Sequence, residues 1–319
     1  MMLSRSAEDL YWMARYMERA ENNARVLDVS NRMAMMHAAE QGEDLYWRPA
    51  LQIGPDPAAF DKVHPETTRA SVIDYMVLDR HNPSSILSCI QAARENARAE
   101  RSLISTEMWE SLNQTWLEIK DMDSARLDAW GYRKFFDWIK ERSHLFRGVT
   151  FGTLLHDDGF RFLRLGGYIE RADSTARILD VKYHVLLPST ADVGGAVDYY
   201  QWGALLRSVS AFAAYRRVYR NTIDPARVAE LLILNADMPR SLHASYGFIV
   251  DMLNALAGNR QLECQRLAGE IHASLRFGRI DQIFKSGLHE FLEAFILRNN
   301  RLGHEIQQDF MMSEVVVVD

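Results

Sequence analysis

Several features that would point to a familiar class of protein are missing from this sequence. Only two cysteines, Cys89 and Cys264, occur in 319 residues, too few for a disulfide framework or for a zinc site made of cysteines. No apolar run approaches the ~18–20 residues that cross a membrane, and the first residues lack the apolar core of a signal peptide. These absences predict a soluble, cytoplasmic protein that keeps both cysteines reduced and does not contact membranes.

Neither sign of charge dominates, and the common catalytic motifs are absent. The net charge is −6 and the isoelectric point about 6.0, so binding to nucleic acid is not expected. The sequence has no Gly-rich phosphate loop, no Gly-x-Ser-x-Gly elbow and no Cys-x-x-Cys pair. A di-iron bundle needs two Glu-x-x-His motifs, and Glu141 with His144 forms the only one. We therefore expect no cofactor and no metal, and no catalytic residue can be named.

The sequence does contain an internal repeat. Residues 16–29 return as residues 168–181, and nine of the fourteen positions are identical without a gap. Further matches follow in register at Trp47 with Trp202 and at Pro83 with Pro239. No strand-like alternation of useful length is present. We expect an all-α protein, a duplicated helical bundle whose two halves are related by a pseudo-two-fold axis.

The repeat and the helix signals divide the chain into four segments. Residues 1–125 form a first helical repeat, residues 126–154 a connecting helix and loop, residues 155–310 a second repeat, and residues 311–319 a short tail.

Helix boundaries inside these segments follow from capping residues, prolines and glycines. Long helices are expected at about 6–40 and 160–187, with a loop at 54–66 and irregular chain at 144–159. Asn82 is expected to cap the helix that Pro83 begins. The pair Gly166-Gly167 lies inside a long helix, which suggests close approach by another backbone or a ligand.

Both copies of the repeat place charge beside an apolar stripe. At 100° per residue, four charged residues per copy share one face, namely Glu18, Glu21, Arg25 and Asp28, then Glu170, Asp173, Arg177 and Asp180. Arg19 and Arg171 point elsewhere on the same projection. The stripe is compatible with a solvated face held by i,i+4 pairs of ~0.2–0.5 kcal/mol each. Because it occurs twice, a buried network or binding site stays equally open.

The second interpretation makes two specific predictions. Six side chains should be less exposed than ordinary helix charges: Glu18, Glu21, Arg25, Glu170, Asp173 and Arg177. A ligand bearing a carboxylate or another anionic group should lie between the halves, held by some of Arg25, Arg98 and Arg177 through the planar fork of the guanidinium. Together these residues form the candidate ligand site, and an amino acid or short peptide fits their mixed charges.

Motifs along nearly the whole chain resemble the bacterial alpha-E family, an all-helical domain named for a Glu-Arg motif. The resemblance rests on residues 4–8, 11–12, 15–21, 24–25, 82–85, 93–98, 104–110 and 168–173. One departure is Gly167, where the family pattern and Arg15 of the first copy lead us to expect an arginine.

The resemblance implies a bacterial protein of undefined biochemistry, similar to components encoded beside circularly permuted ATP-grasp ligases and transglutaminase-like peptidases. One hypothesis is a non-catalytic helical partner that presents an amino acid or peptide to an ATP-grasp-type ligase. The other is an enzyme of the same pathway that uses the paired Glu and Arg stripes for acid–base catalysis. The substrate and the oligomeric state do not follow from the sequence.

Overall fold

Helices make up the fold, and no strand occurs in the part of the chain that the structure describes. The computed structural model describes residues 2–37, 44–51, 54, 57–185, 196–220 and 222–312. The elements are α1 (Ser4–His37), α2 (Asp44–Leu51), α3 (Pro57–Val63), α4 (Arg69–Ile73), the π-helical turn η1 (Asp74–Leu78), α5 (Ile86–Ala99), α6 (Thr106–Ile119), α7 (Ser124–Trp130), α8 (Tyr132–Thr153), α9 (Asp158–Val185), α10 (Ala196–Ser208), α11 (Phe212–Tyr219), α12 (Pro225–Ile233), α13 (Leu242–Ala257), α14 (Glu263–Arg276), α15 (Ile280–Ser286) and α16 (Leu288–Phe310). The all-α prediction is confirmed.

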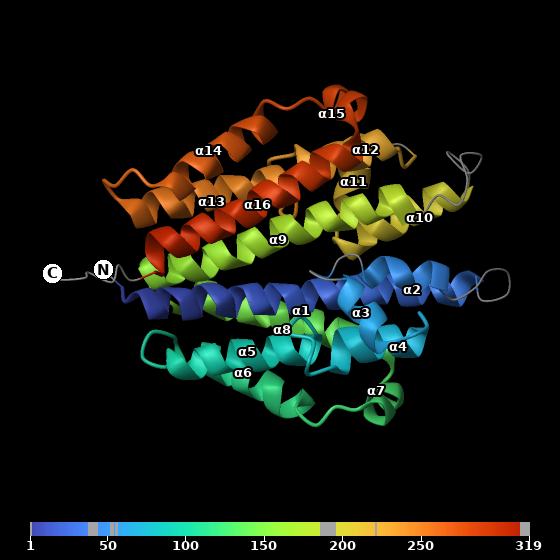
Figure 1. The fold of residues 1–319 in the computed structure, drawn as a ribbon, viewed down its shortest axis with the longest axis horizontal. Helices are drawn as coiled ribbons and strands as arrows, with labels where there is room; N and C mark the ends of the chain where they lie inside the picture. Colours follow the sequence, from blue (N-terminus) through green and yellow to red (C-terminus); the bar gives the residue numbers. More distant parts are fainter. Residues whose placement is uncertain are drawn as a thin grey trace.

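The two longest helices, α1 and α9, lie side by side at the centre of the molecule (Figure 1). Helices α5 and α8 pack on α1, whereas α13 and α16 pack on α9. A further helix covers each set, because α6 contacts α5 and α8 while α14 contacts α13 and α16. The core therefore extends outwards in both directions from the contact between α1 and α9.

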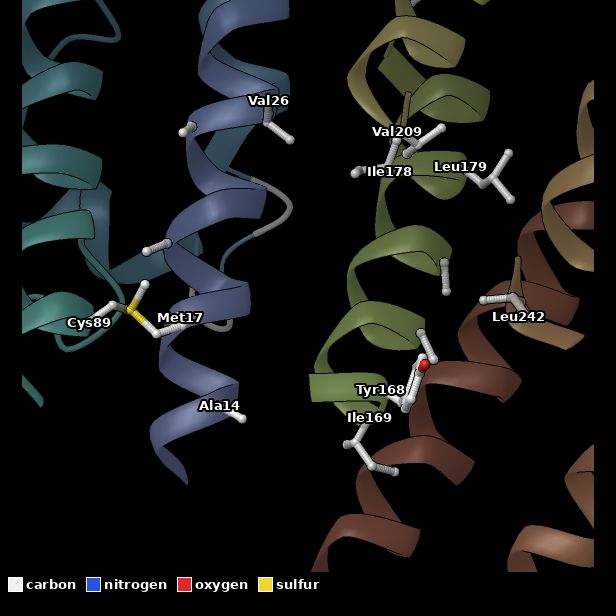
Figure 2. Close-up of a cluster of buried hydrophobic side chains, with 14 of the residues drawn as sticks. Ala14, Met17, Val26, Cys89, Tyr168, Ile169, Ile178, Leu179, Val209 and Leu242 are labelled. Carbon is white, nitrogen blue, oxygen red and sulfur yellow. The ribbon is translucent and has the colours of Figure 1, made fainter. Parts of the chain in front are cut away.

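Apolar side chains fill the spaces beside the two central helices. Figure 2 shows Val26 of α1 and Ile178 of α9 pointing into the space between these helices, and Met17 lying beside Cys89 of α5. All four side chains are buried. Because α1 and α9 have helices packed on both sides, side chains on most of their faces are buried.

Gly166 is a point of close backbone approach between α1 and α9. A Cβ atom at this position would lie only 2.1 Å from the carbonyl oxygen of Tyr11. The backbone approach expected for the Gly166-Gly167 pair is confirmed at Gly166. Gly167 differs, because a Cβ there would meet no atom within 4 Å.

Several expected boundaries were wrong for local reasons. Helix α8 continues into the segment expected to be irregular and ends at Thr153, since buried Phe146 and Thr150 hold it in the core. Only residues 154–157 of that segment separate α8 from α9. A further break lies at Gly131, between α7 and α8, where a φ of 88° suits glycine. The expected loop at 54–66 contains α3.

The helix expected to begin at Pro83 begins three residues later, at Ile86. Ser85 is its N-cap and accepts a hydrogen bond from the Ser88 amide at 3.1 Å. The Asn82 side chain instead accepts from the Ser84 amide at 2.9 Å, which closes a turn before the helix. The expected end of the second long helix at residue 187 and most of the tail at 311–319 lie outside the described residues.

No described helix combines the length and the apolar character that crossing a lipid bilayer requires.

Candidate functional site

The two Glu-Arg pairs of the repeat bind each other across the contact between α1 and α9. Arg171 donates two hydrogen bonds to Glu18, from Nε to Oε1 at 3.0 Å and from Nη2 to Oε2 at 2.8 Å. Arg19 does the same to Glu170, at 2.6 and 3.0 Å. Each contact is a bidentate pair, the strongest geometry available to arginine and a carboxylate. The arginine of each motif therefore binds the glutamate of the other.

Additional arginines surround both glutamates. Arg147 of α8 lies 2.9 Å from Glu18, and Arg240, from the segment before α13, lies 3.2 Å from it. Arg15 donates to Glu170 at 2.9 Å. The side chains of both glutamates are at most 8% exposed, so each pairing takes place largely away from water.

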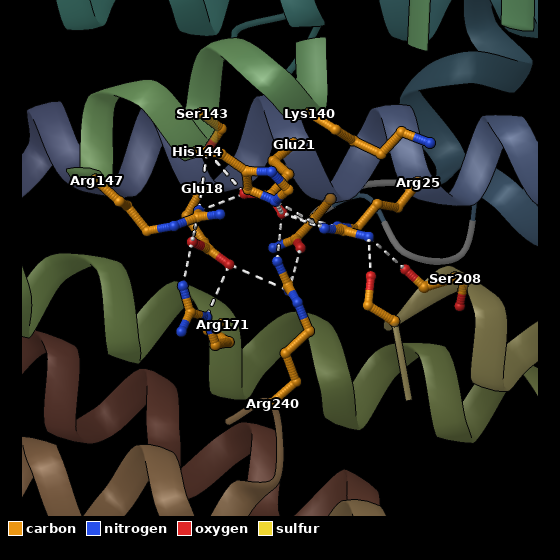
Figure 3. A network of polar contacts seen from close by, with 12 residues as sticks. Glu18, Glu21, Arg25, Lys140, Ser143, His144, Arg147, Arg171, Ser208 and Arg240 are labelled. Carbon is orange, nitrogen blue, oxygen red and sulfur yellow. Dashed lines mark hydrogen bonds and ion pairs between the residues drawn. The ribbon is translucent and has the colours of Figure 1, made fainter. Parts of the chain in front are cut away.

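Glu21 joins this network to α8 and to Arg25. Its carboxylate accepts hydrogen bonds from Arg240 Nη2 at 2.5 Å, from Arg25 Nε at 2.8 Å and from Ser143 Oγ at 2.7 Å. Arg147 also donates to it. Figure 3 shows these groups converging on Glu18 and Glu21 from α8, from α9 and from the segment that carries Arg240.

The arginines hold the carboxylates in the ionised form. Burial by itself would raise the pKa of Glu18, but Arg171 and Arg240 lower that pKa to about 2. Burial would also raise the pKa of Glu170, but Arg19 and Arg15 lower that pKa to about 2. At Glu21, the nearby cations bring the pKa well below its ordinary value despite complete burial. All three groups are fixed negative charges at neutral pH.

Arg240 is buried against the two carboxylates of α1. Burial lowers its pKa to about 10, against the opposing effect of Glu21 and Glu18. The guanidinium therefore stays protonated near pH 7 and binds both carboxylates and Asn22 Oδ1, which accepts at 3.0 Å.

A cleft of about 710 Å³ opens beside this network, between α1, α8 and α10. Its described lining is mostly charged and includes Arg25, Asp28, Arg32, Asp137, Lys140, Glu141, His144 and Arg207. Lys140 lies 3.1 Å from Asp28 and 2.6 Å from Asp137. No carboxylate in the described part of the chain lies within ion-pair distance of Arg207, which instead stacks on the Phe212 ring at 4.2 Å.

Arg25 connects the cleft to the buried network. Its Nη1 donates to Ser210 Oγ at 2.7 Å and to the Ser208 carbonyl at 3.4 Å, and its Nη2 lies 3.3 Å from His144 Nε2. Arg25 is only 6% exposed, whereas the His144 side chain is 56% exposed. The guanidinium is thus fixed from α1, α8 and the end of α10 while lining the open space.

Comparison with known proteins identifies the family. Residues 2–311 match the model of Alpha-E, which is described as a predicted alpha-helical domain with a conserved ER motif. This chain belongs to the Alpha-E family. Its two Glu-Arg pairs, at positions 18–19 and 170–171, are the reciprocal pairs at the centre of the fold.

The curated relatives of this Alpha-E chain are uncharacterised and much longer. One is from Mycobacterium bovis and two are from strains of Mycobacterium tuberculosis, each 25% identical over 255 residues. The match covers 75% of this chain but only 28% of each relative. No solved structure matches the chain.

The Alpha-E structure brings six of the seven candidate ligand residues to the central helices. Those from α1 are Glu18, Glu21 and Arg25, and those from α9 are Glu170, Asp173 and Arg177. None of these side chains is more than 20% exposed, so their expected low exposure is confirmed. Asp173 and Arg177 pair with each other at 2.6 Å. Arg98 lies apart on α5, where its 66% exposed side chain pairs with Glu95 at 3.0 Å.

The helical projection was wrong about Arg19 and Arg171, which it directed away from the site. Both arginines are long enough to reach across to the facing helix, and their identity in both copies was the available signal. Arg147 and Arg240 lie outside the repeated segment and carried no such signal. Arg147 of α8 binds Glu18 at 2.9 Å beside Gly167, the position at which α9 lacks the expected arginine.

No group of three or more His, Cys, Asp or Glu side chains in the described segments is placed to hold a metal ion. The acidic side chains of this Alpha-E centre have arginine partners instead.

Proposed function

We propose that this Alpha-E chain is a non-catalytic helical partner that binds an amino-acid- or peptide-like ligand for an ATP-grasp-type ligase. The ligase would form or modify peptide-type amide bonds. The observation that carries the binding role is the cleft, with Arg25 held rigidly at its inner wall and both signs of charge around it.

The size and charge of the cleft suit a small zwitterion. Its volume of about 710 Å³ is within the range of ~300–1,000 Å³ common for small-molecule sites. Arg207 offers donors to a ligand carboxylate beside the fixed positive charge of Arg25, whose N–H groups already bind the protein. Asp137 and Glu141 offer acceptors to an amine. A single-sign ligand such as a nucleotide would place negative charge against these acids.

The role of a partner protein is supported by the relatives. Because the chain spans 28% of their length, the Alpha-E region occurs there beside other parts of one polypeptide. Such a region is expected to work with neighbouring domains. The family resemblance implies that those neighbours include an ATP-grasp-type ligase and a transglutaminase-like protein.

We also infer that the fold consists of two duplicated halves. Helices α5 and α8 lie on α1 as α13 and α16 lie on α9. Gly131 and Gly287 break the chain at matching places with φ of 88° and 100°. The Asn23 side chain donates to the carbonyl oxygen of Ser84 at 2.7 Å. Thr175, which matches Asn23 in the repeat, donates to the carbonyl oxygen of Arg240 at 2.9 Å.

These correspondences favour a modified division of the chain. Helix α8 contacts α1 and α6, and α16 contacts α9 and α14 in the same way. Residues 126–154 then belong to the first half and do not merely connect the two halves.

The alternative role, an acid–base enzyme, receives less support from the glutamates. A general acid or base works best with a pKa near the working pH, whereas Glu18 and Glu170 have pKa values of about 2. His144 is the one histidine among the described lining residues of the cleft, and it is the group on which catalysis would depend. Replacing His144 with Gln should leave the pathway's ligase reaction intact if the chain only binds.

Titration with free amino acids and short peptides tests the binding role. Arg25→Lys keeps the charge but loses the fork that ties Glu21, Ser208 and Ser210 together at the wall of the cleft. The affinity of this variant should therefore fall by about tenfold or more relative to the wild type. Arg98→Lys, at an exposed pair on α5, is the control and should bind normally. Equal affinity in all three proteins, each shown to be folded by circular dichroism, would remove Arg25 from the site.

The partner role needs a separate measurement. Co-purification with a neighbouring ATP-grasp protein, followed by an ATP-consumption assay with candidate amino acids, should show turnover that requires both proteins. Full turnover by the ligase alone would contradict it.

A further inference from the structure

Arg164 of α9 is a half-buried arginine that has no acidic partner in the described part of the chain. Its guanidinium stacks over the Tyr168 ring, 4.8 Å from the centroid, and Nη2 donates a hydrogen bond to the Tyr168 hydroxyl. Burial lowers the pKa of Arg164, and the positive charges of Arg171 and Arg147 lower it further. A cation in this position lacks the counter-charge that buried arginines normally have.

The uncompensated charge faces a small cavity of about 30 Å³ between α1, α8 and α9. Arg147, Arg164 and Arg171 line it together with Glu18 and Gly167. Room for a single water needs only ~10–15 Å³ by this measure, so the space admits one small polar group. The missing side chain of Gly167 is what leaves it open, since a Cβ there would meet nothing within 4 Å.

The charges around the cavity do not balance. Three guanidinium groups face one carboxylate, Glu18, and Arg171 already binds both of its oxygens. Arg147 divides its Nη1 between Glu18 and Glu21. The local excess of positive charge is therefore met by no group of the described protein.

The matching place on the other side of the central helices is filled. There Arg15 occupies the position that corresponds to Gly167, and it binds Glu170 and stacks on Trp12 at 4.4 Å. The Arg15 side chain also reaches Gly303 of α16, since a Cβ added to Gly303 would lie 3.8 Å from Arg15 Nη1. Of these two matching places in the described chain, the one beside Gly167 is the one that holds an open cavity with a spare arginine.

We propose that the cavity beside Gly167 is a subsite for one oxyanion group, a carboxylate or a phosphate, bound by Arg164 and Arg147. The Tyr168 hydroxyl accepts from Arg164, so its own proton is available to the same anion. Arg171 stays hydrogen-bonded to Glu18 and acts on the anion only through its positive charge. A carboxylate or phosphate in this place receives charge-assisted hydrogen bonds from two α-helices and compensates the excess charge.

This subsite is separate from the cleft. Arg25, Lys140 and Arg207 line the cleft and do not line the cavity. Loss of amino-acid binding through Arg25→Lys and loss of anion binding at Gly167 are therefore measured with different ligands and different variants, and one can fail without the other.

Calorimetric titration of the full chain with inorganic phosphate and with sodium acetate, at constant ionic strength set by sodium chloride, tests the proposal. The wild type should bind at least one of them, and the effective anion tells a phosphate site from a carboxylate site. Arg164→Gln should lower that affinity by about tenfold or more, and Gly167→Leu should do the same by filling the space. Arg161→Gln, whose arginine pairs with Asp158 at 3.0 Å one turn earlier, is the matched control and should bind like the wild type.

Thermal unfolding separates binding from a structural role. Without added anion, Arg164→Gln should melt at or above the wild-type temperature, because it removes an uncompensated charge, and added anion should no longer stabilise it. A purely structural Arg164 predicts a lower melting temperature. The proposal is overturned if neither anion binds the wild type, or if Arg164→Gln and Gly167→Leu bind as tightly as it does.

Discussion

Arg171 binds both carboxylate oxygens of Glu18 across the contact between α1 and α9, at 3.0 and 2.8 Å, although 153 residues separate them. The same geometry joins Arg19 to Glu170. Adjacent residues of one Glu-Arg motif are thus not partners of each other. The motif instead fixes two helices together, because each glutamate is ionised and buried only while the other helix supplies its arginine.

The first prediction concerns this bidentate contact. Arg171→Lys keeps the charge but cannot bind both oxygens of Glu18, so the free energy of unfolding should fall by roughly 1.5–3 kcal/mol, the contribution of one hydrogen bond to a charged group. Urea denaturation measures the change. Arg161→Lys, at a 30% exposed pair on the same helix, should unfold like the wild type. Equal loss in both variants would mean that the bidentate geometry contributes nothing.

The second prediction concerns pH. The pKa values of Glu18 and Glu170 are about 2 in the folded protein, against an ordinary value of 4.5. Between pH 2 and pH 4.5 the unfolded chain binds more protons than the folded protein. The stabilisation that the ionised glutamates provide is therefore complete above pH 4.5 and is lost as the pH falls towards 2. A shift of this size corresponds to roughly 3 kcal/mol for each group.

Urea denaturation between pH 7 and pH 3 measures this dependence. Glu18→Gln should be less stable at pH 7 and should lose less stability on acidification, because one of the buried titrating carboxylates is gone. A decline as steep as that of the wild type would show that Glu18 does not titrate in this range.

The third prediction compares the adjacent glycines of α9. Gly166→Ala places a methyl group 2.1 Å from the Tyr11 carbonyl oxygen and should destabilise the protein by about 1–3 kcal/mol through overpacking. Gly167→Ala meets no atom within 4 Å and should stabilise it by up to about 1 kcal/mol through helix propensity. Thermal unfolding should show a lower melting temperature than the wild type for Gly166→Ala and a higher one for Gly167→Ala. Similar behaviour of the pair would contradict the close approach of α1 and α9 at Gly166.

Much of the fold was readable from local pattern. Capping residues and apolar spacing predicted the starts of the two longest helices closely, since α1 begins at Ser4 and α9 at Asp158 against the expected residues 6 and 160. Errors arose where packing overrides local preference. Gly148 and Gly152 indicated irregular chain, yet α8 continues through both because its neighbouring side chains are buried.

The candidate site was predicted less completely, because helical periodicity reports the faces of one helix only. It placed Glu18, Glu21 and Arg25 beside the apolar stripe, and all three are buried. It could not place Arg147 or Arg240, which reach Glu21 from 126 and 219 residues away. It also grouped Arg98 with the site, although α5 turns that residue outwards.

The sequence by itself determined an all-helical Alpha-E chain with the Glu-Arg motif present twice, because helix propensity, apolar spacing and the repeat are local properties. Only the tertiary structure decided which arginine meets which glutamate, and that Arg164 is left beside an open cavity. The physical reason is the length of the arginine side chain. An arginine side chain extends far enough to cross from one helix to the next, so its partner depends on which helix packs opposite, and that choice is made by the whole core.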